Sequence, residues 1–165
     1  MEIGSNWETI RQVFEEAQKS CFHFAVATIR PDGTPDAAPI GSLILRDDFT
    51  GYYLEEFPAH MAANLKHNPR VCVLAVNADK LYWGKSLMEG IFSMPPAVRL
   101  YGTAGELRKA AKAEVEAWQK KVALASKTRG YKIMWENMSH ARDITFDSFE
   151  PVVIGEMTAE LWGGI

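Results

Sequence analysis

Two histidines, His60 and His67, lie seven residues apart in the segment 55–71, EEFPAHMAANLKHNPRV. Such a pair can bind a metal, help to hold a phosphate, or simply pack. Residues seven apart share a helix face, but they are separated by about 10 Å along the helix axis. Two imidazoles that bind one zinc ion must each lie about 2 Å from it, so this pair does not suit a shared metal. No other cluster of Cys, His and carboxylate residues has ligand spacing, and the sequence predicts no metal site.

The start of the same short helix suits an anion better. Pro58 fits the first helical position, where a missing N–H costs nothing. The free backbone N–H groups of a first turn attract an anion, and His60 lies at the right height to add a donor. We expect His67 to face solvent or to interact with the negative end of the helix dipole. Glu55 and Glu56 precede the helix and would repel a phosphate unless they point away from it.

The composition limits the classes of function. A chain of 165 residues, 47% hydrophobic and 24% charged, is typical of a soluble protein with one domain and one core. The net charge of −3 provides no positive face for nucleic acid. The apolar runs are too short to span a membrane, and no secretory signal is expected. Cys21 and Cys72 lie in apolar, strand-like runs without a CxxC partner, so we expect buried, reduced thiols in a cytoplasmic protein.

Helical and strand patterns divide the chain into elements. Ser5 stands three residues before Glu8, the spacing of a capping box, and helical periodicity predicts a helix from about residue 6 to 19. A second periodic stretch predicts a helix over about 107–126. A tight hairpin is expected at Asp32-Gly33. Runs of aromatic and β-branched residues predict strands at 21–30, 36–45, 52–56, 71–77 and 97–107, and a last strand region at about 142–157, with a break at Pro151.

The sum is a single domain, 1–165, of about six antiparallel strands with flanking helices. The barrel would occupy about residues 20–107, and a closed or nearly closed form is favoured because closure removes exposed edges. The segment 78–96, ADKLYWGKSLMEGIFSMPP, is too long for a hairpin and too apolar for a linker. Long loops of this kind are usually functional or cover another part of the protein.

The order of these segments resembles the pyridoxamine 5'-phosphate oxidase-like FMN-binding split-barrel flavoproteins. The resemblance covers roughly residues 20–110, through PDGTPDAAPIG, GYYLEE, ANLKHNPRV and VRLYGTAGEL in that order. It implies a mainly β fold, a six-stranded antiparallel split barrel with flanking helices. It also implies a homodimer that binds FMN in two clefts at the subunit interface.

The resemblance implies a ring-binding stretch in the second strand, whose backbone would run along the flavin at Pro39, Ile40, Gly41 and Ser42. Glycine at 41 is what a close approach between backbone and a flat ring needs; a simple barrel bend is the alternative. Arg46 falls near the family's basic residue at the end of that strand, and we expect it to bind the flavin phosphate together with His60 and the N-terminus of the short helix. A solvated hairpin charge is the alternative for Arg46.

A phosphate site is implied at the start of the short helix. The family usually carries a serine and a basic pair there, whereas this sequence has Ala59, His60 and Met61. His60 is therefore the side chain of that stretch that can replace the family's basic residue. Asn64, with Asn68-Pro69, keeps the family's exit from helix to strand.

Five further residues have both a functional and a structural interpretation. Trp83, Lys85 and Ser86 either reach the flavin phosphate and ring from the long segment or pack it in place. Trp162 either closes over a cofactor or belongs to an ordered apolar tail. Arg99 aligns with a basic strand residue of the family, with an outward-facing arginine as the default.

The resemblance implies an FMN-dependent oxidoreductase, in which the cofactor carries the electrons and the protein orients it and excludes water. Two alternatives stay open: a flavin- or haem-binding sensor or carrier without turnover, and a deazaflavin-dependent reductase. Family members that oxidise pyridoxamine phosphate carry an Arg-x-His pair near the C-terminus, and FDSFEPVVIGEMTAELWGGI has neither residue. We therefore predict no oxidation of pyridoxamine phosphate. The apolar residues of segment 78–96 suit a neutral or aromatic molecule better. The sequence does not identify the substrate, the electron donor or the acceptor.

Overall fold

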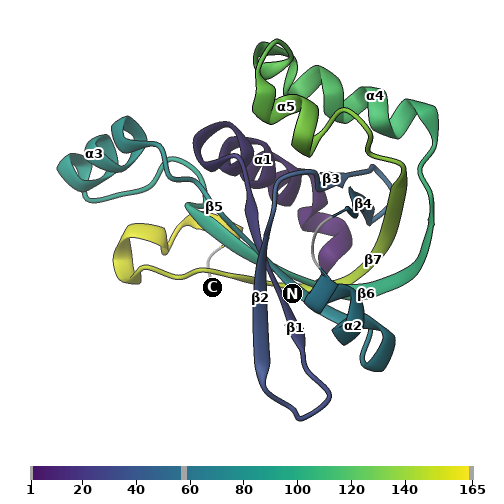
Figure 1. Cartoon of the computed structure of the whole chain (residues 1–165). Coiled ribbons are helices and arrows are strands. Elements are labelled where there is room, and N and C mark those ends of the chain that lie inside the picture. Colours follow the sequence, from purple (N-terminus) through teal and green to yellow (C-terminus); the bar gives the residue numbers. More distant parts are fainter. Residues whose placement is uncertain (1, 57–58, 164–165) are drawn as a thin grey trace.

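A computed structural model describes residues 2–56 and 59–163. Seven strands form one sheet that curls into an open barrel (Figure 1), in the order β2-β1-β5-β6-β7-β4-β3. Each pairing between neighbouring strands is antiparallel. The strands are β1 Phe24–Ile29, β2 Pro35–Ile40, β3 Ile44–Leu45, β4 Thr50–Leu54, β5 Arg70–Val76, β6 Ala97–Lys109 and β7 His140–Pro151. The predicted split-barrel class is confirmed.

The strand count differs from the predicted six because the expected strand 36–45 is divided. β2 pairs with β1, whereas β3 pairs with β4, so the two halves lie at opposite edges of the sheet. Residues 41–43 connect those edges. Ser42 links this connection to β4, because its hydroxyl donates to the Leu54 carbonyl at 3.1 Å and accepts from the Leu54 N–H at 3.0 Å.

Helix α1, Ile3–Cys21, packs its apolar stripe into the barrel. The predicted core residues of this helix, Trp7, Ile10, Val13, Phe14 and Ala17, are all buried. The predicted capping box is wrong, because the helix begins before Ser5, and the Ser5 hydroxyl donates to the carbonyl of Glu2 instead. Cys21 ends this helix and does not lie in a strand; it and Cys72 are half-buried free thiols.

The remaining helices are α2 Ala59–His67, α3 Lys80–Glu89, α4 Lys112–Lys121 and α5 Arg129–Met134. Short 3-10 turns occupy Ala123–Ala125, Gly155–Thr158 and Leu161–Gly163. The predicted helix 107–126 begins too early, because β6 continues to Lys109 in register with β7. None of the described helices is long and apolar enough to cross a membrane.

Helix α3 was not predicted within the long segment 78–96. The Asp79 side chain caps it by accepting from the Tyr82 N–H at 2.8 Å, and Gly90 ends it in the left-handed conformation. Figure 1 shows α3 projecting from the barrel, away from α4 and α5.

A buried ion pair ties the end of β4 to β7. Arg142 donates from Nε to Glu55 Oε2 at 2.7 Å and from Nη2 to Oε1 at 2.8 Å, and both side chains are buried. The hydroxyl of Tyr53 donates to the same carboxylate at 2.5 Å. Burial opposes ionisation of Glu55, but the hydrogen bonds from Arg142 and Tyr53 outweigh it and lower the pKa of this carboxyl.

Candidate functional site

A cavity of about 540 Å³ lies between the end of β2 and the helices α4 and α5. Four of the predicted site residues, Pro39, Ile40, Gly41 and Ser42, line one wall. The other lining residues are Phe22, His23, Ala38, Leu54, Glu56, Trp118, Val122, Met134, Trp135 and Met138. Apolar and aromatic side chains therefore dominate the lining, as in most small-molecule sites.

Gly41 lies at a point of close approach between this wall and two neighbours. A Cβ placed on Gly41 would lie 2.9 Å from the carbonyl oxygen of Phe22 and 3.4 Å from Cη2 of Trp118. Because real Cβ atoms essentially never come so near a backbone oxygen, no other residue fits here without a shift. Packing within the protein thus explains glycine at this position, whether or not a ligand ring also approaches it.

Helix α4 forms a second wall, which meets the first near Gly41, and it carries the buried indole of Trp118. This ring meets Trp135 edge to face, with centroids 5.8 Å apart, which joins α4 to the segment after α5. The two rings belong to a small apolar cluster with Leu54 and Ala141, separate from the main core. The indole Nε1 of Trp118 is buried and has no hydrogen-bond partner in the described part of the chain.

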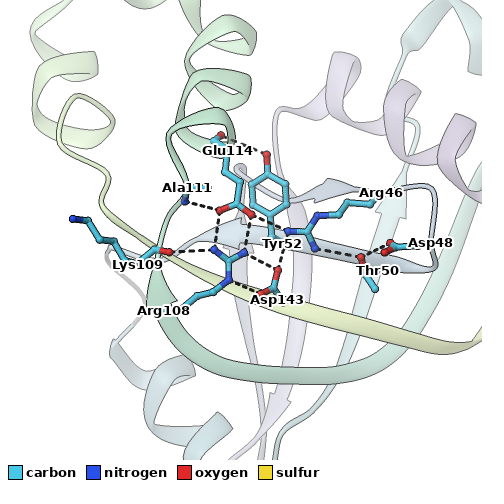
Figure 2. A network of polar contacts seen from close by, with 9 residues as sticks. All are labelled: Arg46, Asp48, Thr50, Tyr52, Arg108, Lys109, Ala111, Glu114 and Asp143. Atoms are coloured by element: carbon cyan, nitrogen blue, oxygen red, sulfur yellow. Dashed lines mark hydrogen bonds and ion pairs between the residues drawn. The ribbon is translucent and has the colours of Figure 1, made fainter.

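A network of charged side chains fixes the start of α4 on the barrel (Figure 2). Arg108 of β6 donates to both oxygens of Glu114, at 2.7 and 2.8 Å, and to both oxygens of Asp143 on β7, at 2.5 and 2.8 Å. The Glu114 carboxylate also accepts from the backbone N–H of Ala111 at 2.9 Å, which caps the helix. The position of Trp118 in the cavity wall therefore depends on ion pairs to two strands.

The same network engages Arg46, which the sequence places near the cofactor. Its Nη2 donates to Glu114 Oε1 at 2.8 Å and to Asp143 Oδ1 at 2.9 Å, and its guanidinium lies over the ring of Tyr52. Hydrogen bonds from Arg108 and then Arg46 outweigh burial and lower the pKa of Asp143 to about 2. Arg46 does not line the cavity, and its contact with a phosphate stays a prediction.

The cavity lining has little charge. Its titratable side chains are His23 and Glu56, and the described lining contains no lysine or arginine. Glu56 accepts from the backbone N–H of Ser139 at 2.7 Å. Glu55 is paired with Arg142. Both acidic residues before α2 are thus engaged by the protein itself.

The predicted residues of α2 do not line the cavity. Ala59 and His60 are exposed in the first turn, and Asn64 is buried, donating to Thr28 Oγ1 at 3.0 Å and to Asp36 Oδ2 at 2.8 Å. Asn64 therefore holds α2 against the first hairpin. The predicted helix-starting role of Pro58 lies outside the described residues. Chain connectivity limits the distance from the Cα of Glu56 to that of Ala59 to about 11 Å, so the start of α2 lies near this end of the cavity.

The predicted residues of α3 and the C-terminal segment also lie outside the cavity lining. The Trp83 indole donates to the Asn77 carbonyl at 2.6 Å and packs edge-on against Phe92. Ser86 is buried, whereas Lys85 is exposed near Glu89. The ring of Trp162 packs against Phe149, with centroids 5.2 Å apart. In this structure these aromatic side chains pack within the chain.

Among the described residues, no group of three or more His, Cys, Asp and Glu side chains is placed to hold a metal ion. His60 and His67 occupy opposite ends of α2, and both are exposed.

Comparisons with known proteins agree with this architecture. The sequence profile of the pyridoxamine 5'-phosphate oxidase family matches residues 9–149. This chain belongs to that family. No curated protein sequence matches it significantly.

Solved structures of the family's fold resemble the chain at low sequence identity. An FMN-binding protein from Syntrophomonas wolfei subsp. wolfei is 16% identical, with a TM-score of 0.58 over 91% of this chain and 94% of that one. HupZ from Group A Streptococcus is 18% identical, with a TM-score of 0.56 over 86% and 91%. An F420 reductase is 14% identical, with a TM-score of 0.52 over 83% and 95%. These likenesses establish the fold.

The aromatic residues of the cavity lining were not predicted from the sequence. Phe22, Trp118 and Trp135 come from three separate elements, and no local pattern shows that they meet. One signal was available in retrospect: Trp118 and Trp135 each stand beside other apolar side chains in a helical segment, and large aromatic residues in such stripes are seldom all left exposed.

Proposed function

We propose that this chain binds FMN, with the flavin ring in the cavity at the end of β2, and acts as an oxidoreductase. The observation that carries the proposal is the cavity itself. The residues that the family resemblance assigns to the ring, 39–42, form one of its walls. Its volume of about 540 Å³ falls in the range typical of small-molecule sites. The FMN-binding protein and the F420 reductase that share the fold support a flavin-type cofactor.

The residues present fit the ring end of FMN. The lining is apolar and aromatic, and Gly41 lets the end of β2 pack closely against the Phe22 carbonyl and Trp118. Bound FMN would supply the electron-transfer chemistry. The chain would orient the ring against the walls formed by residues 39–42 and α4 and exclude water with Trp118, Trp135 and Met138.

The phosphate end must find its donors beyond the cavity lining, which lacks lysine and arginine. We propose the start of α2 for it, where backbone N–H groups and exposed His60 are available. Glu55 does not oppose this, because Arg142 neutralises its carboxylate, and the Glu56 carboxylate is held by the N–H and hydroxyl of Ser139. Arg46 is the less suitable donor, since two carboxylates already neutralise it.

We also propose a homodimer. β2 and β3 are the two edges of an open sheet, and several large apolar side chains are exposed, including Leu81, Leu87 and Met88 of α3. A symmetric partner is the commonest way to cover such surface. Light scattering at micromolar concentration should give twice the chain mass of 18.5 kDa; a monomer would contradict the proposal.

The absorption spectrum of the purified protein, followed by titration with FMN and with riboflavin, tests the cofactor. We expect a flavin spectrum and saturable FMN binding. His60→Ala should weaken FMN binding by about tenfold, since one charge-assisted hydrogen bond contributes about 1.5–3 kcal/mol, and should leave riboflavin binding unchanged. Folded protein that binds neither flavin would refute the proposal. A deazaflavin or haem spectrum would support the two alternatives instead.

A further inference from the structure

Three residues other than glycine have a positive φ angle in the described part of the chain. They are Phe22 at 61°, Phe49 at 62° and Trp162 at 64°. A left-handed backbone is strained for a bulky side chain, and glycine or asparagine is the usual choice. All three positions carry an aromatic ring instead, so each ring needs a reason to be there.

Packing within the protein explains two of these three aromatic rings. Phe49 packs edge-on against Trp7, with centroids 5.4 Å apart, and Trp162 packs against Phe149 at 5.2 Å. In both cases the ring contributes contacts to the core that offset the strained backbone.

Phe22 has no such packing. It is 76% exposed, belongs to neither apolar cluster, and forms no aromatic pair among the described residues. Its backbone, by contrast, is firmly held. The N–H of Phe22 donates to the Gln18 carbonyl at 3.0 Å, which ends α1, and its carbonyl oxygen lies against Gly41. Glycine would satisfy both contacts without strain, so the fold uses the Phe22 backbone but not its ring.

The ring lies at a place where a ligand would meet it. Phe22 lines the 540 Å³ cavity and also a second hollow of about 410 Å³ between α1 and α4. Trp118 and Val122 are shared by both hollows, so Phe22 stands on the rim between them. The cavity wall next to it contains Met134 and Trp135, and thioether side chains adapt readily to a bound ring.

We propose that Phe22 is a ring-stacking residue that covers a planar, uncharged aromatic ring bound in this cavity. This inference rests on the proposed function, in which the ring is that of a flavin. A small ligand is favoured over a second copy of the chain, because Phe22 borders two concave hollows and shares both with the buried indole of Trp118. When a nucleic-acid base stacks on an aromatic side chain, the contact changes affinity by about tenfold or more. We expect an effect of the same size for the ring bound here.

The test measures the binding of FMN, riboflavin and lumichrome. Lumichrome has the fused ring system of a flavin without the side chain that riboflavin and FMN carry. Phe22→Gly should weaken the binding of all three by about tenfold, and Phe22→Trp should bind within about threefold of the unmodified protein. Because Phe22→Gly also relieves backbone strain, the unfolding temperature of the ligand-free protein should rise by about 2–4 °C. Lower affinity in a more stable variant excludes misfolding as the cause.

Phe49→Gly is the matched control. The substitution is the same, and position 49 is also a strained aromatic one. The Phe49 ring, however, packs on Trp7 and does not line the cavity. We expect this variant to lower stability and to leave the three affinities unchanged.

The outcomes separate this inference from the proposed function. If Phe22→Gly binds the three probes with unchanged affinity, the stacking role is overturned, even if FMN binds. If the same variant also loses the dimer, the Phe22 side chain contacts a second copy of the chain instead. A third outcome is that lumichrome binds to the unmodified protein, Phe22→Gly weakens lumichrome binding, and FMN does not bind. The stacking role would then be supported, and the proposal that FMN is the cofactor would be refuted. Failure of all three probes to bind would overturn both.

Discussion

Replacing Arg142 with methionine should destabilise this protein more than any exposed charge replacement. Methionine keeps the length of the side chain but removes its charge and its donors. The change leaves Glu55 buried, with its side chain only 6% exposed, and without a cationic partner. The Gly105 carbonyl also loses its hydrogen bond of 2.8 Å from Arg142 Nη1.

The magnitude follows from burial. Breaking a buried ion pair by removing one partner costs about 3–5 kcal/mol, because an uncompensated charge remains in a low dielectric. Arg108→Met is the matched control on β6. Its side chain is 35% exposed, and Arg46 remains paired with both carboxylates. Exposed pairs contribute about 0.2–1 kcal/mol each, so we expect a loss of about 0.5–2 kcal/mol.

Urea unfolding of the two variants and of the unmodified protein provides the assay, with stability taken from the midpoint at equal slope. A loss below about 1 kcal/mol for Arg142→Met, or a loss no larger than that of Arg108→Met, would refute the assignment of burial as the deciding factor. The double variant Glu55→Leu with Arg142→Met should recover part of the loss, because it leaves no lone buried charge.

Three further predictions concern pH, packing and substrate. Because the pKa of Asp143 is lowered from 3.8 to about 2, its contribution to stability is complete above about pH 4 and is lost as the pH falls through 2. The full pKa shift corresponds to roughly 2.4 kcal/mol of stability. Because the Asp143 side chain is 38% exposed, solvent screening reduces this contribution to about 1 kcal/mol. Acid unfolding that is unchanged in Asp143→Asn would contradict this prediction. Gly41→Ala should weaken FMN binding by about fivefold or more and cost about 1–3 kcal/mol of stability, since its Cβ would meet the Phe22 carbonyl at 2.9 Å. Gly84→Ala, inside α3 with nothing within 4 Å, is the control: it should leave FMN binding unchanged and should not lower the melting temperature. FMN-loaded protein should not convert pyridoxamine phosphate to the aldehyde under air, because the described cavity lining contains no lysine or arginine for a second phosphate; turnover of about 1 per second or faster would show that such a site exists.

The sequence by itself determined the elements and the family. Apolar periodicity placed the buried stripe of α1, and alternation with turn residues placed most of the strands, because these patterns depend only on neighbours along the chain. Its errors occurred where local signals compete. The strand expected at 36–45 has suitable residues throughout, yet it divides at Gly41 because its two halves pair with different strands. The segment expected to be a long loop contains α3, whose cap at Asp79 and end at Gly90 are visible in the sequence once the helix is known.

Only the tertiary structure decided which residues meet in the cavity. Gly41 touches Phe22 and Trp118, which lie 19 and 77 positions away along the chain, and Arg46 is bound by Asp143, 97 positions away. Local propensity carries no information about such distant contacts, since they depend on how strand order brings edges and helices together. For the same reason the family resemblance predicts a phosphate contact for Arg46 but gives no sign of the two carboxylates that bind it in the fold. It also gave no sign of Phe22, whose exposed ring is unusual only beside its strained backbone and the hollow that it borders.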